Sequence, residues 1–203
     1  MPRLNRVRPD GTFARDTGRG MFTGNRGILH GADGEMGAAR WRHKRWICCA
    51  LDHPTGRYHG PVPTRGWTAL FFLDEAVALA AGHRPCFECR RTAARAYRAA
   101  YETAFGAVAS VDVIDAALHA ARVTRQGQIT HVARAETLPD GTFVDQGGPA
   151  LVFGAHLRRV TPAGYAPPLP RPTGPVTVLT PAPSVAALGH GYLPVLHPSA
   201  QVS

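Results

Sequence analysis

The sequence predicts an α+β fold, with a small α/β module in the middle of the chain and a β-rich region at its C-terminal end. The module is predicted by a β-prone run, Thr68–Leu73, that leads directly into a short Ala-rich helix. The β-rich region is predicted by turn signals such as Asp140-Gly141, which separate short β-prone runs beyond residue 130. With 203 residues, the chain can form one domain with a sizeable core or two small domains.

Charge is distributed unevenly, and we divide the chain into three segments. Residues 1–45 carry ten of the 23 Lys and Arg residues, against four of the 14 acidic residues. We expect residues 1–38 to form a basic, Gly-rich arm, and residues 39–106 to form the module and a basic helix that follows it. Residues 107–203 are predicted to hold a helix and the β-rich region. A single compact domain that unites all three segments is the alternative.

The arm is so rich in glycine that we expect loop with short strands at most. After it, Arg40–Ile47 alternates cationic and aromatic side chains and predicts a strand. Cations interleaved with tryptophans suit phosphate contacts combined with base stacking, whereas core packing of both tryptophans is the competing interpretation. The residues expected to contact nucleic acid here are Arg40, Trp41, Arg42, Lys44, Arg45 and Trp46.

Three helices are predicted in the middle of the chain. Asp74 is placed to cap a short helix through Ala81, and Gly82 can end it in the left-handed region. A second helix is expected over residues 92–105 and a third over residues 110–123. Arginines recur at helical spacing at the start of the second helix and are further candidates for phosphate contacts: Arg91, Arg95 and Arg98.

Shorter elements are expected beyond residue 130. Strands are predicted over Thr142–Val144, Ala150–Phe153 and Val176–Thr180, because β-prone residues lie there between turn signals. A short helix is predicted over Ser184–Leu188. These elements make up the β-rich region.

The net charge of +9 and the isoelectric point near 10.2 favour polyanionic partners, although the codon bias of a GC-rich genome is an alternative source of arginine. We predict a cytoplasmic protein, because no apolar signal segment follows the N-terminal arginines. We expect no membrane contact, since the most apolar run, Ala69–Leu73, is far shorter than a membrane span. In a reducing compartment the four cysteines are expected to be metal ligands or free thiols.

The strongest chemical signal is the Cys-x-x-Cys of Cys86 and Cys89. Such a turn presents two sulfurs to one metal ion, and a zinc ion needs two further ligands. Cys49 and His53, four positions apart, are the preferred second pair, so we predict a structural Zn²⁺ held by these four residues. The alternates for the upstream pair are Cys48 and His59. A cysteine-containing turn without metal is the other interpretation.

Residues 68–91, which read TALFFLDEAVALAAGHRPCFECRR, resemble the second half of the zinc module of the Ada DNA-alkylation-response family. The shared pattern is a strand, a short Ala-rich helix and a Gly-x-Arg-Pro-Cys-x-x-Cys turn. The upstream half of that module carries Cys-x-x-x-Cys, where this chain has Cys49-x-x-x-His53. In the family the first upstream cysteine accepts a methyl group from DNA phosphotriesters, and its position here is Cys49. The resemblance implies a zinc fold that binds DNA, and it does not extend to residues 107–203.

We therefore predict a zinc-containing protein that binds nucleic acid, DNA rather than RNA, with DNA repair or DNA processing as an enzymatic extension. For an enzyme, a hydrolase or repair type is favoured over methyl transfer to Cys49. The catalytic candidates are Asp115, His119 and His131, because an Asp–His pair four residues apart on a helix can act as a general base. Two other classes stay open: a small-molecule enzyme braced by zinc, and an interaction module without chemistry.

Overall fold

The computed structural model describes residues 2–52, 66–108 and 110–201. Within these ranges the chain forms four α-helices and two β-sheets, which confirms the predicted α+β class. The helices are α1 (Glu75–Ala80), α2 (Arg91–Phe105), α3 (Val111–Arg122) and α4 (Ala182–Gly189), and two 3-10 turns cover Ala135–Thr137 and Pro198–Ala200. No helix within the described ranges is both long and apolar enough to cross a bilayer.

Each sheet is built from one half of the chain. The first sheet has the strand order β2-β1-β5-β3-β4-β6. Its strands are β1 (Arg6–Val7), β2 (Phe13–Ala14), β3 (Phe22–Asn25), β4 (Ile47–Ala50), β5 (Leu70–Phe72) and β6 (Arg84–Pro85). The second sheet has the order β11-β10-β9-β8-β13-β7, with β12 paired to β10, and it confirms the β-rich C-terminal region. Its strands are β7 (His131–Arg134), β8 (Phe143–Asp145), β9 (Pro149–Phe153), β10 (His156–Thr161), β11 (Gly164–Tyr165), β12 (Leu169–Pro170) and β13 (Pro175–Val178).

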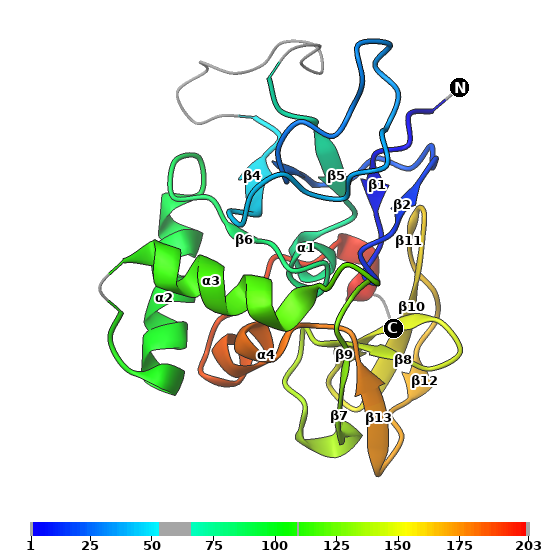
Figure 1. The fold of residues 1–203 in the computed structure, drawn as a ribbon. Helices are drawn as coiled ribbons and strands as arrows, with labels where there is room; N and C mark the ends of the chain where they lie inside the picture. Colours follow the sequence, from blue (N-terminus) through cyan, green and yellow to red (C-terminus); the bar gives the residue numbers. More distant parts are fainter. Residues whose placement is uncertain (1, 53–65, 109, 202–203) are drawn as a thin grey trace.

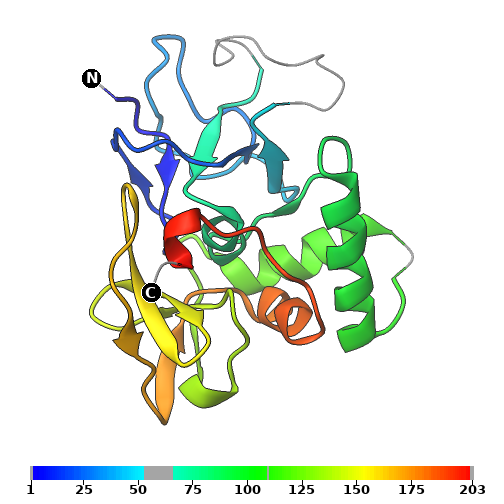
Figure 2. The same ribbon diagram turned by 180° about the vertical axis from the view of Figure 1, so that it is seen from behind.

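Helix α1 lies at the centre of the molecule, between the two sheets (Figures 1 and 2). The first sheet lies on one side of α1 and the second sheet on the other, while α2, α3 and α4 gather at one flank. The three flanking helices share a buried cluster that includes Tyr97, Leu118 and Leu188. The short central helix is therefore the element that both halves of the chain cover.

The ends of α1 follow the sequence prediction. The Asp74 side chain accepts a hydrogen bond of 2.9 Å from the Val77 amide, as an N-cap residue does. After the helix, Gly82 adopts a φ of +82°, and a Cβ there would lie 2.5 Å from the Arg122 side chain. Glycine is thus required both by the backbone conformation and by the close approach of α3.

The other predicted elements lie within a few residues of their expected positions. Helix α2 ends at Gly106, which has a φ of +87°, and α3 begins directly after Ser110. Strands β8, β9 and β13 and helix α4 coincide with predicted runs. The hairpin partner β10 was not predicted, because the adjacent Arg158 and Arg159 interrupt the alternation of polar and apolar side chains that indicates a strand.

The predicted strand over Arg40–Ile47 is wrong, because only Ile47 belongs to a strand. The preceding backbone forms irregular hydrogen bonds instead of a ladder: the Arg42 amide donates to the Arg26 carbonyl at 2.7 Å, and the Trp46 amide donates to the Lys44 carbonyl at 3.1 Å. The Trp46 indole nitrogen also donates to the His43 carbonyl at 2.9 Å. Burial of the indole turns the chain inward, which overrides the alternating pattern.

Part of the predicted Gly-rich arm is a central strand of the first sheet. Strand β3 pairs antiparallel with both β4 and β5, so residues 22–25 share a sheet with the cysteine-bearing strand. A Cβ at Gly24 would lie 2.1 Å from the Ile47 carbonyl oxygen and 2.9 Å from the Phe72 ring. This glycine is needed because two neighbours approach the strand closely.

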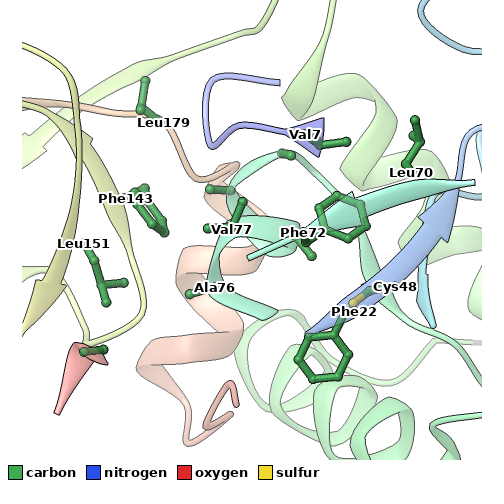
Figure 3. Packing of buried hydrophobic residues seen from close by; sticks show 14 of the residues in the cluster. Val7, Phe22, Cys48, Leu70, Phe72, Ala76, Val77, Phe143, Leu151 and Leu179 are labelled. Atoms are coloured by element: carbon green, nitrogen blue, oxygen red, sulfur yellow. The ribbon is translucent and has the colours of Figure 1, made fainter. Parts of the chain in front are cut away.

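The main apolar core forms around α1 and joins the two sheets (Figure 3). Val77 and Ala76 of the helix pack in one cluster with Phe72 of the first sheet and with Phe143 and Leu151 of the second. All five side chains are at most 1% exposed. Burial of large apolar side chains contributes about 1.5–3 kcal/mol each, so this cluster holds the two halves together.

Two buried carboxylates at the start of α1 hold the C-terminal tail. Glu75 pairs with Arg90 at 2.8 Å, accepts a hydrogen bond from the Tyr192 hydroxyl, and accepts another from the Val195 amide at 2.9 Å. Asp74 accepts from the Tyr165 hydroxyl at 2.7 Å and from the His197 amide at 3.0 Å. Neither carboxylate is exposed. Each therefore depends on these partners to compensate its lost hydration.

We predict that Glu75→Gln lowers the free energy of unfolding by about 3–5 kcal/mol, because the variant leaves the Arg90 guanidinium buried without its carboxylate. Tyr192→Phe removes one donor to the same carboxylate and is expected to cost about 1–3 kcal/mol. Both values are measured by urea denaturation followed by circular dichroism.

Glu136→Gln is the matched control, since its pair with Arg134 is exposed. This variant is expected to change the free energy of unfolding by less than about 0.5 kcal/mol. A Glu75→Gln protein as stable as the control would show that the buried carboxylate does not hold the tail.

Candidate metal centre

Three cysteine sulfurs converge at one end of strands β4 and β6. Strand β6 runs parallel to β4, and the Cys86 amide donates to the Cys48 carbonyl at 3.0 Å. This pairing places the turn of Cys86 and Cys89 beside Cys49. The three sulfur atoms of Cys49, Cys86 and Cys89 lie within 4.8 Å of one another.

The donor set fits a soft or borderline metal ion. Three thiolates that bind one zinc ion at about 2.3 Å in tetrahedral geometry are about 3.8 Å apart, which is within the observed range. Two backbone amides point at the sulfurs: Glu88 donates to Cys86 and Ala50 donates to Cys89, each at 3.4 Å. Such bonds stabilise thiolate charge, and sulfur ligands select zinc, copper(I) or iron–sulfur centres over magnesium or calcium.

Hydrogen bonds among the three thiols shift their pKa values in different directions. Hydrogen bonds from Cys49 and Cys89 lower the pKa of Cys86. Cys49 is the donor in this contact. Its pKa is raised, because the neighbouring sulfurs of Cys86 and Cys89 accept hydrogen bonds from its thiol and so hold its proton. A metal ion has to displace the remaining protons, so its binding is coupled to proton release.

Cys48, an alternate ligand in the sequence prediction, points the other way. Adjacent strand residues face opposite sides of a sheet, so Cys48 lies in the core with no exposed surface. Its sulfur accepts a hydrogen bond of 3.4 Å from Arg90, and burial raises the pKa of its thiol. The structure therefore excludes Cys48 from the cluster. The predicted ligands His53 and His59 lie outside the described residues.

The cations predicted to contact nucleic acid lie mostly at the surface. Exposed side chains are found at Arg40, Arg42, Lys44, Arg45, Arg91 and Arg95. Arg45 pairs with Asp112 at 3.1 Å, and the partly exposed Arg98 pairs with Glu102 at 2.9 Å. Weak surface pairs of this kind leave most of the positive charge available to a polyanion.

The two tryptophans of this segment have different environments. Trp46 is 2% exposed, and the guanidinium carbons of Arg26 and Arg122 lie 4.0 and 3.9 Å from its ring centre. The predicted stacking of Trp46 on a base is therefore wrong for this structure, because the ring is already covered. Trp41 is partly exposed and packs 6.1 Å from Trp46, so it keeps a face toward solvent.

The catalytic candidates do not form a common site. Asp115 is buried, and its two carboxylate oxygens accept hydrogen bonds of 2.8 and 2.7 Å from Arg84. His119 instead contacts Arg122 at 3.1 Å, and burial lowers its pKa. His131 lies on β7 in the second sheet. The predicted Asp–His pair is thus replaced by a structural ion pair.

Sequence reasoning missed three buried polar residues next to this region: Arg26, His83 and Arg122. The Arg26 Nε donates to His83 Nε2 at 3.3 Å, and burial lowers the pKa of His83 well below its usual value. Because arginine is almost never fully buried, an arginine is expected at the surface unless the sequence gives a contrary signal. The local sequence gives no such signal for Arg26.

In comparisons with known protein families, curated proteins and solved structures, nothing matched this chain. The resemblance of residues 68–91 to the Ada zinc module stays a prediction. Function has to be inferred from the cysteine cluster and its surroundings.

We predict that Cys49→Ser, Cys86→Ser and Cys89→Ser each abolish stoichiometric metal binding, because each removes one of three converging sulfurs. Metal content per chain, measured by elemental mass spectrometry on protein purified without added metal, tests this. Cys48→Ala is the matched control and should keep the wild-type metal content. Equal loss in Cys48→Ala would contradict the assignment of the cluster.

We also predict that Asp115→Asn lowers the free energy of unfolding by about 3–5 kcal/mol, since it breaks a buried bidentate pair and leaves Arg84 without a counter-charge. Urea denaturation measures this effect. His119→Gln, on the same helix and partly exposed, is expected to cost less than about 1 kcal/mol. An Asp115→Asn protein of wild-type stability would argue against a structural role.

Proposed function

We propose that this protein is a nucleic-acid-binding protein built around a structural zinc ion. The observation that carries the proposal is the convergence of Cys49, Cys86 and Cys89 within 4.8 Å. In this proposal His53 is the fourth ligand, with His59 as the alternate, as the sequence spacing suggests. A site closed by four protein ligands holds zinc for stability and leaves no open position for catalysis.

The position of the cluster supports a structural role. Its cysteines lie on β4 and on the turn between β6 and α2, so an ion there links the edge of the first sheet to the flanking helix. Strand β6 has only two residues and needs support beyond its two backbone pairings with β4. Metal binding in such modules contributes directly to folding.

Nucleic acid as the partner is supported by charge and by resemblance. The chain carries a formal charge of +9, and exposed cations occur both in residues 40–45 and in the first turns of α2, at Arg91 and Arg95. Phosphate contacts by such residues provide affinity without sequence selection. The similarity of residues 68–91 to the Ada module favours DNA over RNA.

The test is metal analysis combined with a titration of duplex DNA at several salt concentrations. We expect one zinc per chain and a binding constant that falls linearly with salt on logarithmic axes. The double variant Arg42→Ala/Lys44→Ala is expected to bind more weakly to all sequences, with a slope smaller by about 1 for each phosphate that the variant no longer neutralises.

Arg134→Ala, an exposed arginine on β7 in the second sheet, is the matched control and should bind DNA like wild type. Zinc without salt-dependent binding would contradict the nucleic-acid part of the proposal and leave the zinc part standing. Salt-dependent DNA binding by a protein that contains no zinc would contradict the zinc part and leave the nucleic-acid part standing.

A further inference from the structure

A cavity of about 500 Å³ lies beside Trp46, away from the cysteine cluster. It is formed by the N-terminal segment, by residues 38–46 and by the loop that follows α3. Its basic and aromatic lining consists of Phe13, Arg26, Arg40, Trp41, Trp46, Arg122 and Arg125. Asp10 is its one acidic lining residue among those described, and its carboxylate accepts two hydrogen bonds from Thr12.

Two of these arginines are buried without a direct ion pair, although the charge of Asp115 acts on Arg122 from beyond ion-pair distance. Arg26 and Arg122 are each 2% exposed. Within the described ranges neither forms an ion pair with a carboxylate. Other buried arginines do have such partners: Arg84 pairs with Asp115, and Arg90 pairs with Glu75. The contrast sets the cavity arginines apart from the structural ion pairs.

The hydrogen bonds of these two guanidiniums are incomplete. Arg26 donates only long bonds, of 3.4 Å to the Gly11 and Ala81 carbonyls and 3.3 Å to His83. Arg122 donates short bonds to two backbone carbonyls and contacts His119 Nδ1 at 3.1 Å, but its Nε has no hydrogen-bond partner in the described structure. Donor capacity is therefore left over at both residues, where a ligand could use it.

Both side chains stay charged at neutral pH. Burial and the neighbouring Arg122 charge lower the pKa of Arg26 to about 9, and burial lowers the pKa of Arg122 to about 9. Two buried cations without a direct ion pair are costly, because each has lost its hydration and Asp115 acts on Arg122 only from a distance. Packing on the Trp46 ring, at 4.0 and 3.9 Å, offsets part of this cost and orients the planar groups.

We infer that this cavity binds a small molecule that carries an oxyanion, a phosphoryl or carboxylate group, with Arg26 and Arg122 as its charge partners. The planar fork of arginine matches the spacing of two oxygens in either group. The cavity volume lies in the usual range for small-molecule sites, so the ligand can be larger than the anion itself. This site depends neither on zinc nor on nucleic acid, and so goes beyond the proposed function.

The test measures the melting temperature of the full chain with increasing sodium phosphate, sodium succinate or sodium chloride at matched ionic strength. We expect a saturable rise with phosphate or with succinate that chloride does not produce, because a ligand of the folded state stabilises it by mass action. The larger of the two responses identifies the anion class. Adenosine 5′-monophosphate, as a third probe, shows whether the cavity accepts a phosphate on a larger molecule.

Arg26→Met is the decisive variant, since it keeps an unbranched apolar side chain and removes the charged guanidinium group. It is expected to lose the response to the anion while melting, without anion, at or above the wild-type temperature. Arg122→Met should lose the response too, and Arg95→Met, an exposed arginine outside the cavity lining, should keep it.

A full response in Arg26→Met, or no response of wild type beyond that to chloride, would overturn the inference. Should Arg26→Met melt well below wild type, isothermal titration of the folded variant with sodium phosphate and sodium succinate decides instead. Retained wild-type affinity for the stronger-binding anion overturns the proposal, and at least a tenfold loss supports it.

Discussion

The structure depends most on the burial of Asp74 and Glu75 at the start of a short central helix. Carboxylates without exposed surface have to be paired or hydrogen-bonded, and the partners here come from distant parts of the chain. Tyr165 and the tail after α4 approach from the C-terminal half, while Arg90 approaches from the start of α2. The need to satisfy two charges thus determines how both halves meet around α1.

The cysteine cluster is supported by the same arrangement. Arg90 connects Glu75 to the Cys48 sulfur, directly behind the strand that carries Cys49. The Arg90 side chain therefore connects helix α1 to strand β4, which carries one cysteine of the candidate metal centre. A metal ion would stabilise β6, which is the edge strand of the first sheet.

The buried arginines fall into two groups with different consequences. Arg84 and Arg90 have carboxylate partners and explain the packing of the helices on the first sheet. Arg26 and Arg122 have an aromatic ring, backbone carbonyls and a cavity instead. Replacing buried charged groups by apolar side chains of similar volume is often neutral or stabilising, which is one reason why we propose that these two arginines serve a bound anion.

The local features follow from the amino-acid sequence alone: the α+β class, the Asp74 cap, the Gly82 stop and the pairing of two sulfurs in Cys-x-x-Cys. These depend on residues close together in the chain, where capping, glycine conformation and turn geometry act directly. The three-dimensional arrangement was needed to establish which upstream cysteine joins the cluster and that Trp46 turns inward. Both outcomes depend on strand register and burial, which bring together residues far apart in the sequence and are not encoded in any single segment.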